Sequence, residues 1–409
     1  MQNTQNVASA EAAQGAQNSR QAYVNLALAT LAFAAAFTAW SLVSPLAKQI
    51  QSDLGLNDIE RSVLIAVPVL LGSLLRIPLG LLTDRFGGRK VFTALLLFTL
   101  LPVAFIGTAD SFCTYVLGGL FLGAAGASFA VGVPFVSRWF TPDKQGLALG
   151  IYGIGNIGTA VALFSMPALV GALGGRTWAF WFYLVPVALM ALAFWLFARD
   201  APGMPKPKSL GDSLSVLRTE KMAWVLSLFY FLTFGGFVAI ANYLPTLLQE
   251  WFGLTPGDAG LRAAGFTALA TLARPVGGWL ADKFGGSRVL RWVFGAGPVG
   301  ALALAWLALS PDLLLATVVF LATAAGLGLG NGAIFKLVAE YFPKNTGLVT
   351  GIVGCAGGLG GFFPPLLMGA VKGATGTYVL GFVLLAVFSL GCVVTLIMLR
   401  PRSAAEPVA

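Results

Sequence analysis

The sequence predicts an all-α integral membrane protein with twelve transmembrane helices in two homologous six-helix halves. Of the 409 residues, 57% are hydrophobic and only 10% are charged, and the mean hydropathy is +0.85. Such a composition cannot cover a water-soluble surface. The apolar runs are long and do not alternate with polar residues, which excludes a membrane β-barrel. An internal repeat divides the chain into two halves.

Twelve apolar runs, each long enough for a membrane helix, follow one another along the chain. Residues 1–20 lack the features of a signal peptide and are expected to form a disordered cytoplasmic tail. The longest polar interruption, residues 199–221, carries five basic residues and separates an N-terminal half (21–198) from a C-terminal half (222–399), with a second tail at 400–409. The runs cover residues 22–46, 62–82, 91–109, 112–140, 146–172, 177–198, 222–249, 260–281, 289–309, 313–341, 347–371 and 377–399.

Basic residues outside the apolar runs are distributed unevenly. With both termini in the cytoplasm, 17 Lys and Arg lie on the cytoplasmic side and five on the other, which is the asymmetry of an inner-membrane protein in this orientation. The net charge of +9 is therefore attributed to topology, and no nucleic-acid partner is expected. The three cysteines lie in apolar stretches, so neither a disulfide nor a metal site is expected.

The internal repeat is clearest at two places. Arg76–Gly88 recurs 198 positions later as Arg274–Gly286, and Pro142–Gly153 recurs 201 positions later as Pro343–Gly354. Transporters built from repeated halves place the substrate site near the middle of the bilayer, between the halves.

The repeated segments resemble the motifs of a known family. Gly80-x-x-x-Asp84-Arg-x-Gly-Gly-Arg89, echoed at 278–288, is similar to the cytoplasmic loop motif of the major facilitator superfamily. The glycine-rich segments Gly150–Gly158 and Gly351–Pro364 resemble the paired signature motifs of its nitrate/nitrite porter family. The resemblance covers all twelve runs and implies the major facilitator fold and the transport of nitrate and nitrite.

Only Arg76, Arg274 and Lys336 lie well inside apolar runs. A charge in the bilayer costs from about 2.5 to over 10 kcal/mol, so it needs a partner or a ligand. Neither arginine has an Asp or Glu in its own run, and the chain has no histidine. A bound oxyanion is the expected partner, because a guanidinium binds planar oxyanions through two parallel hydrogen bonds. The alternative is pairing with helix-end carbonyls or lipid phosphates.

Aromatic and small residues complete the expected anion site. Tyr230 and Phe234 are four apart and share a helix face, and the resemblance places Phe129 opposite them, so that the rings enclose a flat ligand. On periodicity alone, all three would be packing residues. The glycine stripes of the two signature segments either pack helices or line the cavity, and Asn156 is expected to supply an amide donor. The glycines assigned to the site are Gly153, Gly155, Gly354 and Gly357.

Charges of the repeated loops are expected to control opening. We expect Asp84 with Arg85 and Arg89, and Asp282 with Lys283, to form a network that closes the cytoplasmic side in one state. Lys336 lies near the end of its run and is expected to extend to the lipid head groups; the alternative is a role in anion passage.

The sequence therefore predicts a secondary active transporter that moves nitrate and nitrite across the inner membrane by alternating access. Nitrate/nitrite exchange is preferred over nitrate/proton symport, because no span holds a deep Asp, Glu or His for a proton relay. An exporter of another small organic anion or drug, and a transporter-like sensor, are the remaining alternatives; a small lining and short tails argue against them. The chain is expected to be a monomer in the lipid bilayer, without cofactor or enzymatic activity.

Overall fold

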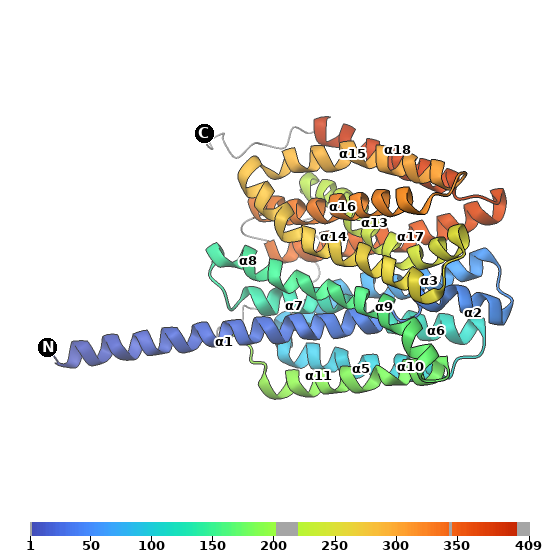
Figure 1. Cartoon of the computed structure of the whole chain (residues 1–409). Coiled ribbons are helices and arrows are strands. Elements are labelled where there is room, and N and C mark those ends of the chain that lie inside the picture. Colours follow the sequence, from blue (N-terminus) through green and yellow to red (C-terminus); the bar gives the residue numbers. More distant parts are fainter. Residues whose placement is uncertain (1, 202–219, 343–345, 399–409) are drawn as a thin grey trace.

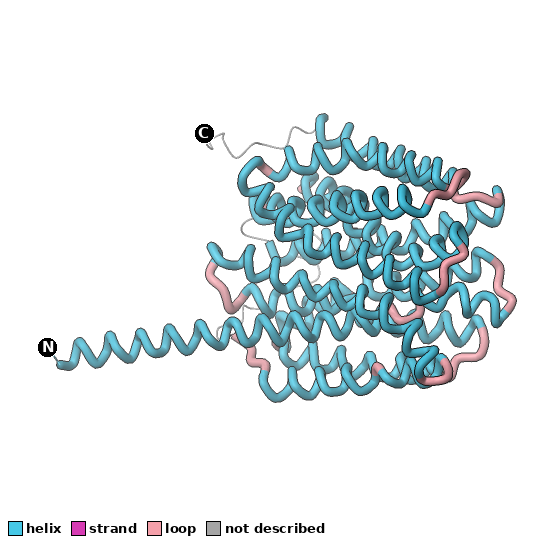
Figure 2. Tube along the Cα trace, viewed as in Figure 1, coloured by secondary structure: helices cyan, strands magenta, loops and turns pink. Residues whose placement is uncertain are grey.

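The computed structural model describes residues 2–201, 220–342 and 346–398. These residues form helices joined by short connections and contain no strand (Figure 2). The expected all-α fold is therefore confirmed. Residues 202–219 of the loop at 199–221, and the whole tail at 400–409, lie outside the described residues.

The N-terminal half is built from short helices that often meet end to end. The first helix reaches back to Gln2, so the tail that was expected to be disordered is helical in the structure. Its elements are α1 (Gln2–Trp40), η1 (Ser44–Leu46), α2 (Ala47–Leu54), α3 (Asp58–Leu74), α4 (Arg76–Phe86), α5 (Gly88–Gly107), α6 (Phe112–Leu122), η2 (Gly123–Ala127), α7 (Ser128–Ser137), α8 (Pro142–Gly153), η3 (Ile154–Asn156), α9 (Ile157–Ala172), α10 (Arg176–Phe182) and α11 (Leu184–Phe197).

The C-terminal half consists of six long helices. Eleven helical segments in the described part of the chain are long and apolar enough to cross a membrane. The twelfth expected span, α14, has 29 residues but is less apolar, because it contains two arginines and many small residues. The six helices are α13 (Lys221–Phe252), α14 (Pro256–Phe284), α15 (Gly286–Leu307), α16 (Leu313–Tyr341), α17 (Thr346–Thr375) and α18 (Val379–Met398).

Figure 1 shows the helices running side by side, with most of the N-terminal half (blue to green) below the C-terminal half (yellow to red). Helix α1 projects from the bundle at the end where α18 also finishes. We call this the terminal end, and the opposite end, where α2 and α10 lie, the far end. An even number of spans places both ends of the chain on one side of the membrane.

Glycines bring the two halves into close contact along two helix pairs. A Cβ atom at Gly358 of α17 would lie 2.3 Å from the Ser73 hydroxyl of α3, and one at Gly260 of α14 would lie 2.2 Å from the Leu163 carbonyl oxygen of α9. Side chains larger than hydrogen are thus excluded there, as is usual where membrane helices approach closely. These contacts join the halves on both sides of the central region.

Candidate functional site

Two buried arginines, one from each half, flank a single aromatic ring. Arg76 is 2% exposed and Arg274 is 9% exposed. The Cζ atoms of Arg76 and Arg274 lie 5.0 and 5.2 Å from the centroid of the Phe234 ring, so the two Cζ atoms are at most about 10 Å apart. The two arginines that the repeat relates therefore meet in the centre of the bundle, at the interface between the halves.

The position of Arg76 follows from a local break in its span. Pro78 has no backbone N–H that could donate to the carbonyl of Leu74, four positions earlier, and helix α3 ends at Leu74. Helix α4 begins at Arg76, after Leu75, which has φ −71° and ψ −11°. The Arg76 guanidinium donates to the carbonyl of Gly354 in the other half, and its Nη2 lies 3.4 Å from the carbonyl oxygen of Gly126.

Neither arginine has an acidic partner among the residues that the structure describes. Both Nε atoms, and Nη2 of Arg274, also lack a hydrogen-bond partner there. Aromatic faces compensate in part, since a cation over a ring gains up to about 2 kcal/mol when it is desolvated. The site therefore presents buried, positively charged donors that a protein group does not neutralise.

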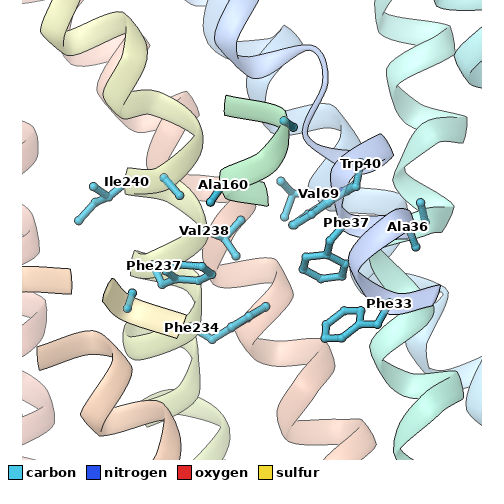
Figure 3. Close-up of a cluster of buried hydrophobic side chains, with 14 of the residues drawn as sticks. Phe33, Ala36, Phe37, Trp40, Val69, Ala160, Phe234, Phe237, Val238 and Ile240 are labelled. Atoms are coloured by element: carbon cyan, nitrogen blue, oxygen red, sulfur yellow. The ribbon is translucent and has the colours of Figure 1, made fainter. Parts of the chain in front are cut away.

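The expected aromatic pair is formed as the helical spacing predicted. The rings of Tyr230 and Phe234 stack with centroids 5.0 Å apart and planes 5° apart, and the Tyr230 hydroxyl is placed to accept a hydrogen bond from Arg274. Figure 3 shows Phe234 of α13 and Phe33 of α1 extending toward each other from the two halves. The interface is lined by aromatic rings around the two guanidinium groups.

Phe129 lies on the other side of Arg76. Its ring centroid is 6.0 Å from the Arg76 Cζ atom, so the guanidinium lies near both Phe129 and Phe234. Phe335 of α16, which sequence reasoning missed, contacts rings of both halves: its centroid is 6.0 Å from that of Phe129 and 5.0 Å from that of Tyr230. Among 31 phenylalanines, no sequence signal separates this one from packing residues.

The four glycines assigned to the site have different surroundings. Gly354 supplies the carbonyl that Arg76 contacts. A Cβ atom at Gly357 would lie 2.2 Å from the Tyr230 ring, and one at Gly155 would lie 2.3 Å from the Phe33 ring. Gly153 is buried, yet a Cβ atom there would meet nothing within 4 Å. Gly153 thus faces internal space, whereas Gly155 and Gly357 permit close packing.

Asn156 uses one N–H of its amide within its own segment, and its role as a donor to the substrate stays a prediction. Its Nδ2–H donates to the Gly153 carbonyl oxygen over 2.7 Å, within the 3₁₀ turn η3, while Oδ1 has no partner among the described residues. The 3₁₀ turn brings residue 156 back over residue 153. The amide carries two N–H groups, so one donor and the Oδ1 acceptor of Asn156 remain available.

At the terminal end, the acidic residues of the two loop motifs have other partners than expected. Asp84 pairs with Arg138 in one half, and Asp282 pairs with Lys336 over 2.8 Å in the other. Lys336 forms a second ion pair with Glu340 at 3.6 Å, and its extension to the lipid head groups stays a prediction. Arg138 and Lys336 are themselves 198 residues apart, so the two pairs are equivalent under the repeat.

The remaining basic residues of the loop motifs contact aromatic rings or a helix end. Arg85 lies 5.3 Å from the Phe86 ring and Lys283 lies 5.3 Å from the Trp279 ring. Arg89 donates to the Trp195 carbonyl in the last turn of α11, where a cation interacts favourably with the helix dipole. The ion pairs of Asp84 and Asp282 thus each stabilise one half, and neither joins the halves.

A polar cluster of Arg61, Tyr243, Glu250 and Tyr378, which we call the far-end cluster, joins the halves instead. Arg61 of α3 is 1% exposed; it donates to Glu250 and to the Tyr243 and Tyr378 hydroxyls, at 3.2 and 3.1 Å for the last two. Nearby, the Ser44 hydroxyl donates to the Asn242 carbonyl oxygen over 2.6 Å. The halves are therefore held together at the far end. Sequence reasoning had counted Arg61 only among the basic residues outside the apolar runs.

Comparison with known proteins agrees with this fold. The family model of the Major Facilitator Superfamily matches residues 29–363 and 226–409. A solved bacterial homologue of the human lysosomal transporter Spinster, in an inward-facing and unoccupied conformation, has a TM-score of 0.71 at 19% identity over 94% of this chain and 99% of that chain. The chain folds as a major facilitator transporter.

Curated relatives define the family more narrowly. The chain is 44% identical to the nitrite extrusion protein of Bacillus subtilis, over 92% of this chain and 94% of that protein. It is 43% identical to a probable nitrate transporter of Staphylococcus haemolyticus, over 91% and 95%. It is 40% identical to a probable nitrate/nitrite transporter of Mycobacterium tuberculosis, over 94% and 97%. The chain belongs to the nitrate/nitrite porter family of the major facilitator superfamily.

Proposed function

We propose that this protein transports nitrate and nitrite across the inner membrane by alternating access, with both termini in the cytoplasm. One observation carries the proposal: Arg76 and Arg274 both lie next to the Phe234 ring, with their Cζ atoms 5.0 and 5.2 Å from its centroid, buried and without a carboxylate partner among the described residues. A monovalent anion between the two guanidinium groups would lower the charge of the site from +2 to +1. The names of the relatives support nitrate and nitrite as that anion.

The flat aromatic lining of the site favours a planar anion. The stacked rings of Tyr230 and Phe234 and the neighbouring ring of Phe335 line the site with flat aromatic faces. Such a lining suits a planar ligand. Guanidinium groups bind planar oxyanions through two parallel hydrogen bonds. A drug exporter would need a larger and chemically more varied cavity, and this lining provides no support for one.

Exchange of nitrate for nitrite is the coupling that the site supports best. A membrane potential that is negative inside opposes anion entry by about 2.3 kcal/mol per 100 mV, and one-for-one exchange removes this cost. Proton symport would need a titratable relay, and the residues that surround the two arginines in the described structure include no Asp, Glu or His. Symport in which water or the ligand carries the protons is the second candidate.

Replacement of each arginine by lysine tests the site. Arg76→Lys and Arg274→Lys keep the charge but lose the planar pair of donors, so we expect both purified, folded variants to lose nitrate transport in proteoliposomes. Arg262→Lys is the matched control for the second variant, because Arg262 is an exposed residue on the same helix, α14. Near-normal transport by either site variant would refute the anion site.

A further inference from the structure

One polar side chain near the arginines is buried without any partner. Asn331 of α16 is 1% exposed, and neither its Oδ1 nor its Nδ2 atom has a hydrogen-bond partner among the described residues. Buried amide groups are nearly always hydrogen-bonded, because an unpaired one loses its hydration without compensation. The retention of Asn331 therefore requires a reason that the fold itself does not supply.

The neighbours of Asn331 show where its side chain points. A Cβ atom at Gly330 would lie 2.7 Å from Thr233 on α13, and one at Gly332 would lie 2.1 Å from the Arg274 carbonyl oxygen on α14. In a helix these two directions lie about 100° to either side of residue 331. Asn331 thus points between α13 and α14, the helices that carry Tyr230 and Arg274.

The same face of α16 continues into the aromatic lining. Phe335 is four residues beyond Asn331 and contacts the Tyr230 ring, with centroids 5.0 Å apart. On the other side, Leu327, four residues before Asn331, lies 3.5 Å from the Cβ position of Gly236 on α13. Residues four apart share a helix face, so Asn331 lies at the level of the Tyr230–Phe234 pair and of Arg274.

We propose that Asn331 is an anion ligand that distinguishes nitrate from nitrite, an inference that rests on the proposed function. Its Nδ2–H donates to an oxygen of the bound anion. The Arg274 Nη2 atom also lacks a partner among the described residues and is available to the same anion. Asn156 differs from Asn331 in that one of its two N–H groups is already bonded to the Gly153 carbonyl oxygen.

Selectivity follows from the number of oxygen atoms. Nitrate offers three oxygens in a plane, whereas nitrite offers two. Two guanidinium groups and Tyr230 can satisfy both oxygens of nitrite, and a donor directed at a third oxygen has a partner only in nitrate. Asn331 therefore strengthens nitrate binding and leaves nitrite binding nearly unchanged.

Titration of the purified full-length protein with nitrate and with nitrite tests the proposal. We expect Asn331→Ala to weaken nitrate binding about tenfold, the loss of one hydrogen bond to a charged ligand, and nitrite binding less than about twofold. Asn242→Ala is the matched control, because Asn242 is 5% exposed and its Oδ1 is also unpaired among the described residues, but it lies two helical turns from Phe234 along α13. The control should leave the ratio of the two affinities unchanged.

The outcomes separate this inference from the proposed function. An unchanged ratio in Asn331→Ala, or an equal loss for both anions, overturns the role of Asn331 while the anion site stands. If Asn331→Ala does not fold, Asn331→Leu, which keeps the bulk of the side chain, decides by the same ratio. If the unmodified protein binds neither anion, the proposed function itself fails.

Discussion

Arg61 of α3 and Glu250 of α13 form an ion pair that joins the two halves of the protein at the far end. Arg61 is 1% exposed and Glu250 is 17% exposed, and the Tyr378 hydroxyl donates to the same carboxylate over 2.6 Å. At the terminal end, by contrast, the Asp84–Arg138 and Asp282–Lys336 ion pairs each lie within one half. The structure therefore represents a state that is closed at the far end, and opening there requires the Arg61–Glu250 pair to separate.

Removal of the acidic partner should favour the state that is open at the far end. In Glu250→Gln, the buried Arg61 keeps Asp58 of its own half, 3.3 Å away, but loses the counter-charge across the interface. Loss of a partner costs about 3–5 kcal/mol in a fully buried pair and less here, because Asp58 remains and Glu250 is partly exposed. We expect faster labelling of a cysteine introduced by Ser44→Cys, in a variant without the three native cysteines, by a maleimide that cannot cross the membrane.

An ion pair at the same end provides the control. Arg176 and Asp53 lie 3.1 Å apart and are 24% and 45% exposed, and both belong to the N-terminal half. Asp53→Asn removes a carboxylate without affecting the interface, and an exposed pair contributes only about 0–1 kcal/mol. Equal labelling rates for Glu250→Gln and Asp53→Asn would show that the far-end cluster does not control opening.

The Tyr230 hydroxyl should contribute to anion binding. Tyr230→Phe keeps the ring that stacks on Phe234 and removes only the group that faces Arg274. We expect nitrate binding to weaken by about 1–3 kcal/mol, through the loss of one hydrogen bond to a charged ligand or to the guanidinium that holds it. Calorimetric titration measures the change, with Tyr183→Phe, at a distant hydroxyl that contacts Ser165, as the control. Unchanged affinity in a folded variant would place Tyr230 outside the site.

The close approach of α17 to Tyr230 should be sensitive to a single methyl group. A Cβ atom at Gly357 would lie 2.2 Å from the Tyr230 Cδ1 atom, whereas one at Gly351, on the same helix, would meet nothing within 4 Å. Gly357→Ala must therefore displace the ring or the helix, and we expect transport to fall at least tenfold, the effect of about 1.4 kcal/mol. Gly351→Ala should transport normally. Similar rates in the two variants would mean that the ring tolerates displacement.

Residues whose chemistry conflicts with their surroundings were predictable from the sequence. Arg76 and Arg274 stand out because a charge inside an apolar run needs an explanation, and the repeat already related them. The Tyr230–Phe234 stack follows from helical spacing alone. The pairing of Lys336 with Asp282 could also have been predicted, because Arg138 and Lys336 are 198 residues apart, as are Asp84 and Asp282.

Contacts that depend on how helices pack across the interface could not be predicted. Glu250 lies 189 residues from Arg61, and nothing in either segment indicates the other, because their contact exists only when the halves close at the far end. The bond from one Asn156 N–H group to Gly153 was also not predictable, because the local 3₁₀ turn that forms it has no distinct sequence pattern. Local geometry of this kind decides which polar atoms remain available to a ligand.

The charge of the site without a bound anion bears on the coupling mechanism. With nitrate bound, the two arginines and the anion together carry +1, whereas the site without an anion carries +2. Two guanidinium groups at most about 10 Å apart repel each other by roughly 2 kcal/mol or more at an effective dielectric constant near 20. Closure of both halves around the site should therefore be slower without an anion than with one.

This difference predicts that transport is obligate exchange. The loaded carrier passes through the closed state, whereas the empty carrier is held back by the repulsion between Arg76 and Arg274. We expect labelled nitrate to enter proteoliposomes rapidly when nitrite or nitrate is present inside and slowly when the interior contains neither. Arg274→Gln should not convert the protein into a uniporter, since it also removes the ligand. Rapid net uptake into anion-free liposomes, driven by a pH gradient alone, would instead show that protons accompany the anion and that symport is the correct mechanism.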